Sequence, residues 1–342
     1  MTREMDIQAV LERRSRIVCG DGLSAVKDLL AGEEELFLVY DEKVSEVAGT
    51  LVGLLPEIKG SFALDAAEAE KQIETVLALC RQLLEADASR QAFLIALGGG
   101  FTTDIAGFAA AIYKRGIRYG NIPTTLLAQA DAAIGGKTGV NLDGCKNMLG
   151  AFHLPSFTFL CADVLATLPP RERRNGLAEV AKTLLIGDAD AYADLLENGL
   201  SARSVFRAAE IKAAIVQKDP FEQGERAKLN LGHSFGHAIE QEALRTGVDL
   251  AHGEAVAMGI LLAAEISERN KLAEKGFAER LKAEFERIGL PVESPFPPET
   301  LLPALRKDKK TAGGKITLAL PVKPGTVVLK AFDIHDLHFS TE

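Results

Sequence analysis

The chain has no tryptophan, only four cysteines and no long apolar run. Its longest apolar segments reach about a dozen residues, whereas a helix that crosses a bilayer needs roughly 20. Cys19, Cys80, Cys145 and Cys161 show no CxxC spacing and are too sparse for a disulfide framework, so we expect reduced thiols. The N-terminal residues 1–7 lack the apolar core of a signal peptide. Together these absences predict a cytoplasmic protein.

The chain is also short of positive charge. Its 39 Lys and Arg residues face 48 Asp and Glu residues, which gives a net charge of −9 at pH 7. This balance argues against nucleic acid or an anionic membrane as the main partner. An anionic small molecule would therefore need a local group of cations that works against the overall field.

The first half of the chain alternates apolar strands with helical patterns. Residues 35–40 and 92–97 form buried-strand runs, and residues 68–86 between them repeat apolar side chains every three or four positions. Strand, helix and strand in this order predict a Rossmann-like parallel sheet with crossover helices. Ligands then belong at the carboxyl ends of the strands.

The second half of the chain is mainly helical by pattern. The break at Leu168–Pro170 predicts two domains, an α/β domain over residues 1–168 and a mainly helical domain over residues 169–342. Helical periodicity and two late strand patterns mark the second domain. The expected helices cover residues 203–218, 229–243, 254–274, 275–288 and about 299–307, and the expected strands cover 315–321 and 327–332.

Three of the six histidines lie within twenty residues, at positions 233, 237 and 252. His233 and His237 are four apart, so they share one face of a helix. Imidazole is the commonest metal ligand and titrates near neutrality. One such histidine would more simply be a hydrogen-bonded core residue. Three in a glycine-rich, otherwise apolar segment favour metal or acid–base chemistry.

Two glycine-rich segments suggest anion binding. Gly98–Asp104 follows a strand and precedes a helix, where backbone N–H groups can approach a phosphate, although it does not match G-x-G-x-x-G. Gly135–Thr138 lacks the first glycine of a P-loop, which excludes a nucleotide triphosphatase of that type. Lys137, Lys146 and Asn147 remain candidate contacts for phosphate or carboxylate.

Glu179 and Lys182 lie three apart on an expected helix at the start of the second domain. An ordinary ion pair explains them. Glu179 could instead complete a site with two histidines, since two His and one Glu form a known catalytic zinc arrangement.

The chain closely resembles the 3-dehydroquinate synthase family of sugar phosphate cyclases. The resemblance covers nearly the whole chain and rests on segments in the family's order, namely GGGFTTDIAGFAAAIYKRG, IPTTLLAQADAAIGGKTGVN, CKNMLGAF, NGLAEVAK, LNLGHSFGHAIE and a later DKK. It implies a Rossmann-like nucleotide-binding domain, a mainly α-helical C-terminal domain and, as partners, a sugar phosphate substrate and a second copy in a homodimer.

The resemblance also implies cofactors and roles for residues. The metal ligands would be Glu179, His233 and His252, holding zinc or alternatively cobalt. NAD⁺ would contact Asp41, Glu68, Lys71, Gly99, Gly100, Asp104, Thr124, Thr125 and Lys146. Substrate would contact Asp131, Lys137, Asn147, Lys182, Lys212, Arg226, Asn230, His237, Lys309 or Lys310, and Arg115 from the partner. Catalysis would use His237 and Glu222 as proton acceptors, together with Lys182, Arg226 and Asn230.

The implied reaction converts 3-deoxy-D-arabino-heptulosonate 7-phosphate to 3-dehydroquinate and phosphate on the shikimate path to chorismate and the aromatic amino acids. It is a lyase reaction that proceeds through transient oxidation by NAD⁺, β-elimination, reduction and intramolecular aldol closure. Two alternatives are another cyclase, such as 2-deoxy-scyllo-inosose synthase, and a metal-dependent NAD polyol dehydrogenase similar to glycerol dehydrogenase. The dehydrogenase leaves the group of cations unexplained.

Overall fold

The computed structural model describes residues 14–307, 311–312 and 315–333. Its first half is built on a six-stranded, all-parallel sheet in the order β1-β8-β5-β4-β2-β3. The strands are β1 (Arg16–Gly20), β2 (Leu36–Asp41), β3 (Ile58–Leu64), β4 (Phe93–Gly98), β5 (Arg118–Pro123) and β8 (Phe157–Cys161). The predicted Rossmann-like parallel sheet is therefore confirmed.

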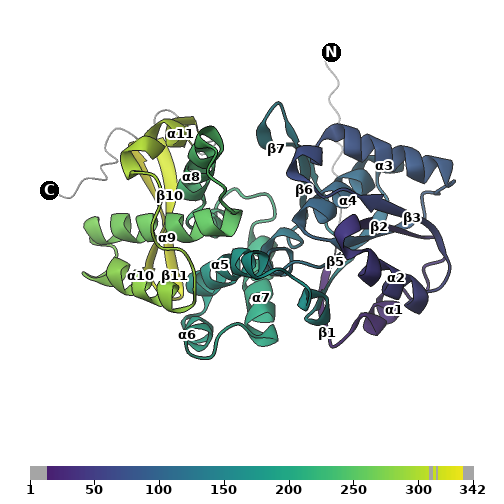
Figure 1. Ribbon diagram of the computed structural model, residues 1–342, viewed down its shortest axis with the longest axis horizontal. Coiled ribbons are helices and arrows are strands. Elements are labelled where there is room, and N and C mark those ends of the chain that lie inside the picture. Colours follow the sequence, from purple (N-terminus) through teal and green to yellow (C-terminus); the bar gives the residue numbers. More distant parts are fainter. Residues whose placement is uncertain (1–13, 308–310, 313–314, 334–342) are drawn as a thin grey trace, which may run out of the picture.

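Helices cover both faces of this sheet (Figure 1). They are α1 (Val26–Leu29), α2 (Ser45–Leu54), α3 (Ile73–Glu85) and α4 (Gly100–Ile112). Side chains alternate across each strand, so Phe37 and Val39 pack with α3 and α4, whereas Leu36 and Leu38 pack with α1 and α2. Burial on both faces explains why β2 and β4 are continuous apolar runs in the sequence.

A mainly helical domain follows, with a small antiparallel sheet of order β11-β10-β9. Its helices are α5 (Pro170–Gly187), α6 (Ala189–Asn198), α7 (Ala202–Lys218), α8 (His233–Thr246), α9 (His252–Arg269), α10 (Phe277–Arg287) and α11 (Leu302–Lys307), and its strands are β9 (Thr311–Ala312), β10 (Lys315–Lys323) and β11 (Thr326–Asp333). One apolar core runs through all of these helices and the sheet. The expected late strand pair is thus an antiparallel hairpin.

The structure corrects the starts of three predicted helices. The helix expected from residue 229 begins at His233, because Gly232 has a left-handed φ of 78° and residues 225–230 form a separate 3₁₀ turn. The helix expected over 68–86 is interrupted, with a 3₁₀ turn at Glu68–Glu70 ahead of α3. The helix expected over 254–274 already begins at His252 and ends at Arg269.

A separate β-hairpin precedes the last strand of the parallel sheet. It consists of β6 (Lys137–Leu142) and β7 (Cys145–Phe152), paired in antiparallel fashion. Figure 1 shows the hairpin between the parallel sheet and the helical domain. Within residues 14–307, 311–312 and 315–333, no helix has both the length and the apolar character that a bilayer crossing needs.

Candidate functional site

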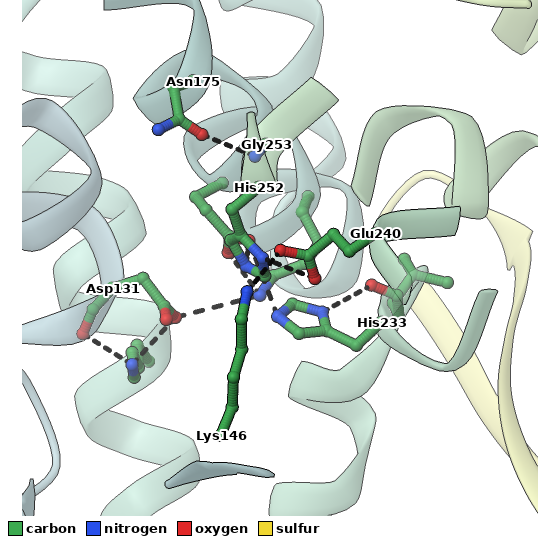
Figure 2. A network of polar contacts seen from close by, with 11 residues as sticks. Asp131, Lys146, Asn175, His233, Glu240, His252 and Gly253 are labelled. Carbon is green, nitrogen blue, oxygen red and sulfur yellow. Dashed lines mark hydrogen bonds and ion pairs between the residues drawn. The ribbon is translucent and has the colours of Figure 1, made fainter. Parts of the chain in front are cut away.

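Three side chains from three helices converge at one point. Glu179 lies within α5, and His233 and His252 are the first residues of α8 and α9. The Nε2 atoms of both histidines lie 3.6 Å from Glu179 Oε1. Figure 2 shows the two imidazoles side by side among the surrounding helices. Residues that are 54 and 73 positions from Glu179 in the sequence therefore share one site.

These residues fit a divalent metal ion. Glu179 is completely buried, and neither of its carboxylate oxygens has a partner in hydrogen-bond geometry. The Lys182 ammonium lies beside Oε2, whereas Oε1 has only the two imidazoles near it, and a cation bound at Oε1 would reduce the cost of burying this charge. Ligand atoms in a tetrahedral zinc site with bonds of about 2.0–2.1 Å are separated by roughly 3.3–3.4 Å. The observed 3.6 Å separations need only a slight contraction, and the N, N, O donor set suits zinc or cobalt.

A second group of potential ligands shares His252 and adds His237 and Glu240. The His252 Nδ1 atom lies 3.4 Å from Glu240 Oε2. His237 is exposed, with its ring centre 5.5 Å from that of His233 and 6.1 Å from that of His252. His237 thus lies beside the triad, on its solvent side.

Close helix contacts bring these ligands together. An added Cβ atom at Gly253 would lie 2.0 Å from the Asn175 backbone oxygen, so only glycine lets the start of α9 approach α5. Asn175 Oδ1 accepts a hydrogen bond from Gly253 N at 2.5 Å. Gly232 approaches Val256 in the same way, with 2.7 Å between its hypothetical Cβ and the Val256 oxygen. The glycines next to the histidines therefore permit the close packing that forms the site.

Buried cations surround a second carboxylate next to the triad. Asp131 lies in a π-helical turn, Ala128–Ala132, a distortion often found at functional sites. Its Oδ1 atom lies 2.8 Å from Lys212 Nζ and 3.8 Å from Lys182 Nζ. Lys182 Nζ is also 2.5 Å from Glu179 Oε2. Lys182 is 1% exposed and Lys212 6%, so the predicted metal ligand and substrate residues belong to one buried charge cluster.

The pKa values in this cluster follow from burial and pairing. Burial acts to raise the pKa of Glu179, but the Lys182 ammonium and His252 outweigh it and lower the value to about 2. Burial likewise acts to raise the pKa of Asp131, and Lys212 and Lys182 bring it below its usual range. For Lys212 burial prevails and lowers the pKa, whereas at Lys182 the attraction of Glu179 overcomes burial and raises it. Both carboxylates are ionised at neutral pH.

Ion pairs connect the hairpin to the helical domain. Lys137 in β6 pairs with Glu222, whose Oε1 accepts from Asn230 Nδ2 at 2.7 Å. Lys146 in β7 lies 2.9 Å from Glu240 Oε1. Burial acts to raise the pKa of Glu222, but Lys137 and Asn230 lower it. Two cations expected to contact ligands are therefore paired with carboxylates.

Arg226 is buried and directed at backbone oxygens. Its guanidinium donates to the Pro220 and Gly135 carbonyls at 2.5 and 3.0 Å and lies 5.8 Å from the Phe152 ring centre. Burial lowers the pKa of Arg226. The structure thus places this side chain where β6 begins, next to the loop that carries Glu222.

The glycine-rich turn lies where β4 ends and α4 begins. Gly99 precedes the helix and Gly100 is its first residue. Hypothetical Cβ atoms there would lie 3.0 Å from Thr125 and 3.1 Å from Ala132, so the turn is closely packed. Thr124 N donates to Gly98 O at 2.9 Å, which joins the end of β5 to this turn. This is the sheet edge at which nucleotides bind in such folds.

Of the other predicted nucleotide residues, Lys71 and Asp104 pair with each other, while Glu68 and Asp41 contact other polar groups. Lys71 Nζ donates to Asp104 Oδ2 at 2.6 Å and to Asn147 Oδ1 at 3.0 Å. Burial outweighs Lys71 and raises the pKa of Asp104. Glu68 Oε1 accepts from Asn141 Nδ2 at 2.8 Å, and Asp41 Oδ1 accepts from Lys43 N at 3.0 Å. Lys71 thus links a predicted nucleotide residue to a predicted substrate residue.

Two sets of predicted contacts lie elsewhere. Arg115 follows α4, at the opposite end of that 13-residue helix from the glycine-rich turn and hence about 20 Å away along its axis. Lys309 and Lys310 lie outside the described residues. Sequence reasoning missed the contact of Glu240 with His252 and that of Asn175 with Gly253. The Glu240 contact had a signal in the sequence, because a residue seven positions after His233 lies on the same helix face.

The fold and site together combine a Rossmann-like α/β domain with a helical domain that carries a Glu-His-His group able to hold a divalent metal. The sequence profiles described as 3-dehydroquinate synthase N-terminal and 3-dehydroquinate synthase C-terminal match residues 61–175 and 176–311. The chain belongs to the 3-dehydroquinate synthase family.

Curated relatives agree with this assignment. A 3-dehydroquinate synthase of Thermococcus kodakarensis is 46% identical over 268 residues, which cover 78% of this chain and 76% of the relative. One from Rhizobium johnstonii is 40% identical over 332 residues, covering 90% and 88%.

Solved structures of related cyclases have the same fold. The 2-epi-5-epi-valiolone synthase of Streptomyces hygroscopicus, with NAD⁺ and Zn²⁺ bound, superposes with a TM-score of 0.86 at 31% identity and 95% coverage of both chains. A 2-deoxy-scyllo-inosose synthase with carbaglucose-6-phosphate, NAD⁺ and Co²⁺ gives 0.80 at 25% identity and 93% coverage of both chains. A probable glycerol dehydrogenase from Sinorhizobium meliloti gives 0.58 at 16% identity, over 84% of this chain and 83% of that one, and shares the fold alone.

Proposed function

We propose that this protein is a 3-dehydroquinate synthase. It would convert 3-deoxy-D-arabino-heptulosonate 7-phosphate to 3-dehydroquinate and phosphate, as a carbon–oxygen lyase of the shikimate pathway. The observation that carries this proposal is the Glu179-His233-His252 triad with two buried cations next to it, Lys182 in contact with Glu179 and Lys212 in contact with the neighbouring Asp131. A metal-dependent polyol dehydrogenase needs the triad but has no use for a group of cations beside it.

The cofactors proposed are NAD⁺ and one divalent metal ion, zinc or cobalt. When bound, they supply a reversible hydride acceptor and a Lewis acid for oxygen atoms of the substrate. Glu179, His233 and His252 would hold the metal. The backbone N–H groups at the start of α4 would bind the pyrophosphate, and Thr124, Thr125 and Asp104 would add nearby contacts to the nucleotide.

Glu222 and His237 are proposed to move protons. Glu222 is ionised at neutral pH because Lys137 and Asn230 lower its pKa, so it can accept a proton as the substrate ring is rearranged. His237 lies on α8 one turn after His233, and an exposed imidazole there can exchange protons with both substrate and solvent.

The anionic groups of the substrate would be held by the side chains that line the hairpin and the buried cluster. Those proposed are Lys137, Asn147, Lys182, Lys212, Arg226 and Asn230, with Asp131 orienting the two buried lysines. Cations near the departing phosphate stabilise the charge that develops on it. Substrate would compete with Glu222 for Lys137, and displacement of that carboxylate would rearrange the loop before α8.

The assembly is proposed to be a homodimer in the cytoplasm. Arg115 lies far along α4 from the glycine-rich turn of its own chain, which suits a residue that reaches a partner's site. Lys309 and Lys310 are proposed as further substrate contacts.

A turnover assay separates this function from its alternatives. Purified protein with catalytic NAD⁺ and zinc should release phosphate from the heptulosonate phosphate and form dehydroquinate, with no net NADH. Glucose 6-phosphate should give no product, whereas 2-deoxy-scyllo-inosose from it would indicate the other cyclase. NADH that accumulates in step with glycerol consumption would indicate the polyol dehydrogenase. Loss of both bound metal and activity is expected for Glu179→Ala.

A further inference from the structure

The two histidines of the triad are oriented by different acceptors. His233 Nδ1 lies 3.2 Å from the Leu231 carbonyl oxygen, and His252 Nδ1 lies 3.4 Å from Glu240 Oε2. In both cases the acceptor occupies the Nδ1 side of the ring and leaves Nε2 directed at Glu179 Oε1. A metal-binding histidine usually donates its second N–H to such an acceptor, which fixes its tautomer and orientation.

We propose that Glu240 is a positioning residue of the metal site, acting through His252. Its carboxylate accepts the Nδ1–H of His252 and so presents Nε2 to the ion that Glu179 and His233 also bind. The inference rests only on the metal-binding part of the proposed function.

The surroundings of Glu240 suit this role. It lies on α8 seven residues after His233, so the ligand and the positioning residue share one helix face. Its side chain is 12% exposed, and each oxygen has its own partner, Lys146 for Oε1 and His252 for Oε2. Figure 2 shows the Glu240 carboxylate directed toward these two side chains. The Lys146 pair anchors the carboxylate from the hairpin side and leaves Oε2 for the imidazole.

Geometry distinguishes this role from direct ligation. Glu240 approaches the Nδ1 side of the His252 ring, whereas Glu179 faces Nε2 on the other side. A metal held by the triad therefore lies across the ring from Glu240. Ligation by His237, Glu240 and His252 would need a different position, on the Nδ1 side.

The test measures metal binding by the apo-protein. Zinc affinity is determined by competition with a chelator, and Co²⁺ titrations record the visible absorption of the bound ion. Substituting an acceptor behind a ligating histidine typically weakens metal binding 10–100-fold. We expect a loss in that range for Glu240→Ala and a smaller one for Glu240→Gln, because the amide oxygen still accepts a hydrogen bond without the charge. The Co²⁺ spectrum should change in both variants.

Two controls isolate the role. Glu242→Gln removes a carboxylate from the same helix that pairs with Arg245, and it should bind metal as the wild type does. Lys146→Met should alter zinc affinity less than Glu240→Ala, because the contact with His252 remains. Circular dichroism of the apo-variants confirms that each is folded.

Wild-type zinc affinity and an unchanged Co²⁺ spectrum in folded Glu240→Ala would overturn the proposal. A loss in His237→Ala equal to that in Glu240→Ala, with Glu179→Ala still binding zinc, would also overturn it and indicate direct ligation. These readouts do not depend on turnover. Failure of the synthase assay with the expected metal affinities would therefore count against the function and not against Glu240.

Discussion

Replacing Lys182 with methionine should destabilise the metal-free protein strongly and the zinc-bound protein much less. The ammonium lies 2.5 Å from Glu179 Oε2 in a site where lysine and glutamate are 1% and 0% exposed. Methionine has a similar length but no charge, so the substitution leaves a buried carboxylate without its counter-ion. Removing one partner of a buried ion pair costs about 3–5 kcal/mol.

Zinc should reverse most of this loss, because a metal ligated by Glu179 replaces the missing positive charge. Lys182 also repels a metal bound beside it, so the variant should gain more stability from zinc than the wild type does. For domains of this size the metal-free Tm should fall on the order of 10 °C. The double variant Glu179→Gln/Lys182→Met, which removes both charges, should recover part of the stability that Lys182→Met loses in the metal-free protein.

Differential scanning calorimetry of wild type, Lys182→Met and the double variant, each with EDTA or with excess zinc, measures these differences. Leu185→Ala, a cavity in the same helix and core, serves as a control, since its loss of stability should be the same with and without zinc. Equal destabilisation of Lys182→Met under both conditions would refute Glu179 as the ligand.

Two further predictions concern the support of the site and of the fold. Gly253→Ala should lower both Tm and zinc affinity, because its Cβ would lie 2.0 Å from the Asn175 backbone oxygen and push the helix of His252 away from that of Glu179. The control Gly49→Ala, which has open space around it, should lower neither quantity. An unaltered zinc affinity in Gly253→Ala would contradict the expectation. Asp188 caps α6, and the Ala191 N–H and the Arg207 guanidinium lower its pKa below the value in the unfolded chain. The ionised carboxylate therefore stabilises the fold at pH values above the unfolded pKa, and this stabilisation is lost as pH falls through the folded pKa. Asp188→Asn keeps a capping oxygen, so its Tm should fall less than that of the wild type between about pH 5 and pH 3, and parallel Tm curves would exclude this contribution.

The sequence predicted the fold well where local patterns carry the information. β2, β4 and α7 are each near the expected range. The start of α8 was placed four residues too early, because the apolar pattern continues through Leu229 and Leu231 while the left-handed Gly232 breaks the helix. Periodicity reports which residues are buried and not where the backbone turns.

The convergence of the metal triad could not be derived from spacing. Glu179 is brought to His233 and His252 by the packing of α5 against α9 and of α8 against α9, which depends on glycine contacts between distant segments. Local spacing instead groups His233 with His237, and the structure places His237 on the solvent side. The family resemblance supplied the ligand set before any geometry was known.

Charge reasoning from the sequence was incomplete in a different way. An acidic protein that binds an anion was expected to present a group of cations, and the structure does bring lysines together. It also pairs Lys137 with Glu222 and Lys146 with Glu240. An incoming anion therefore competes with a carboxylate for each ammonium, so its binding free energy is smaller than the attraction of a free lysine would give. The displaced Glu222 loses the ammonium that lowers its pKa and becomes a better proton acceptor. In this arrangement, binding of the substrate's charge would itself prepare the base that the proposed reaction needs.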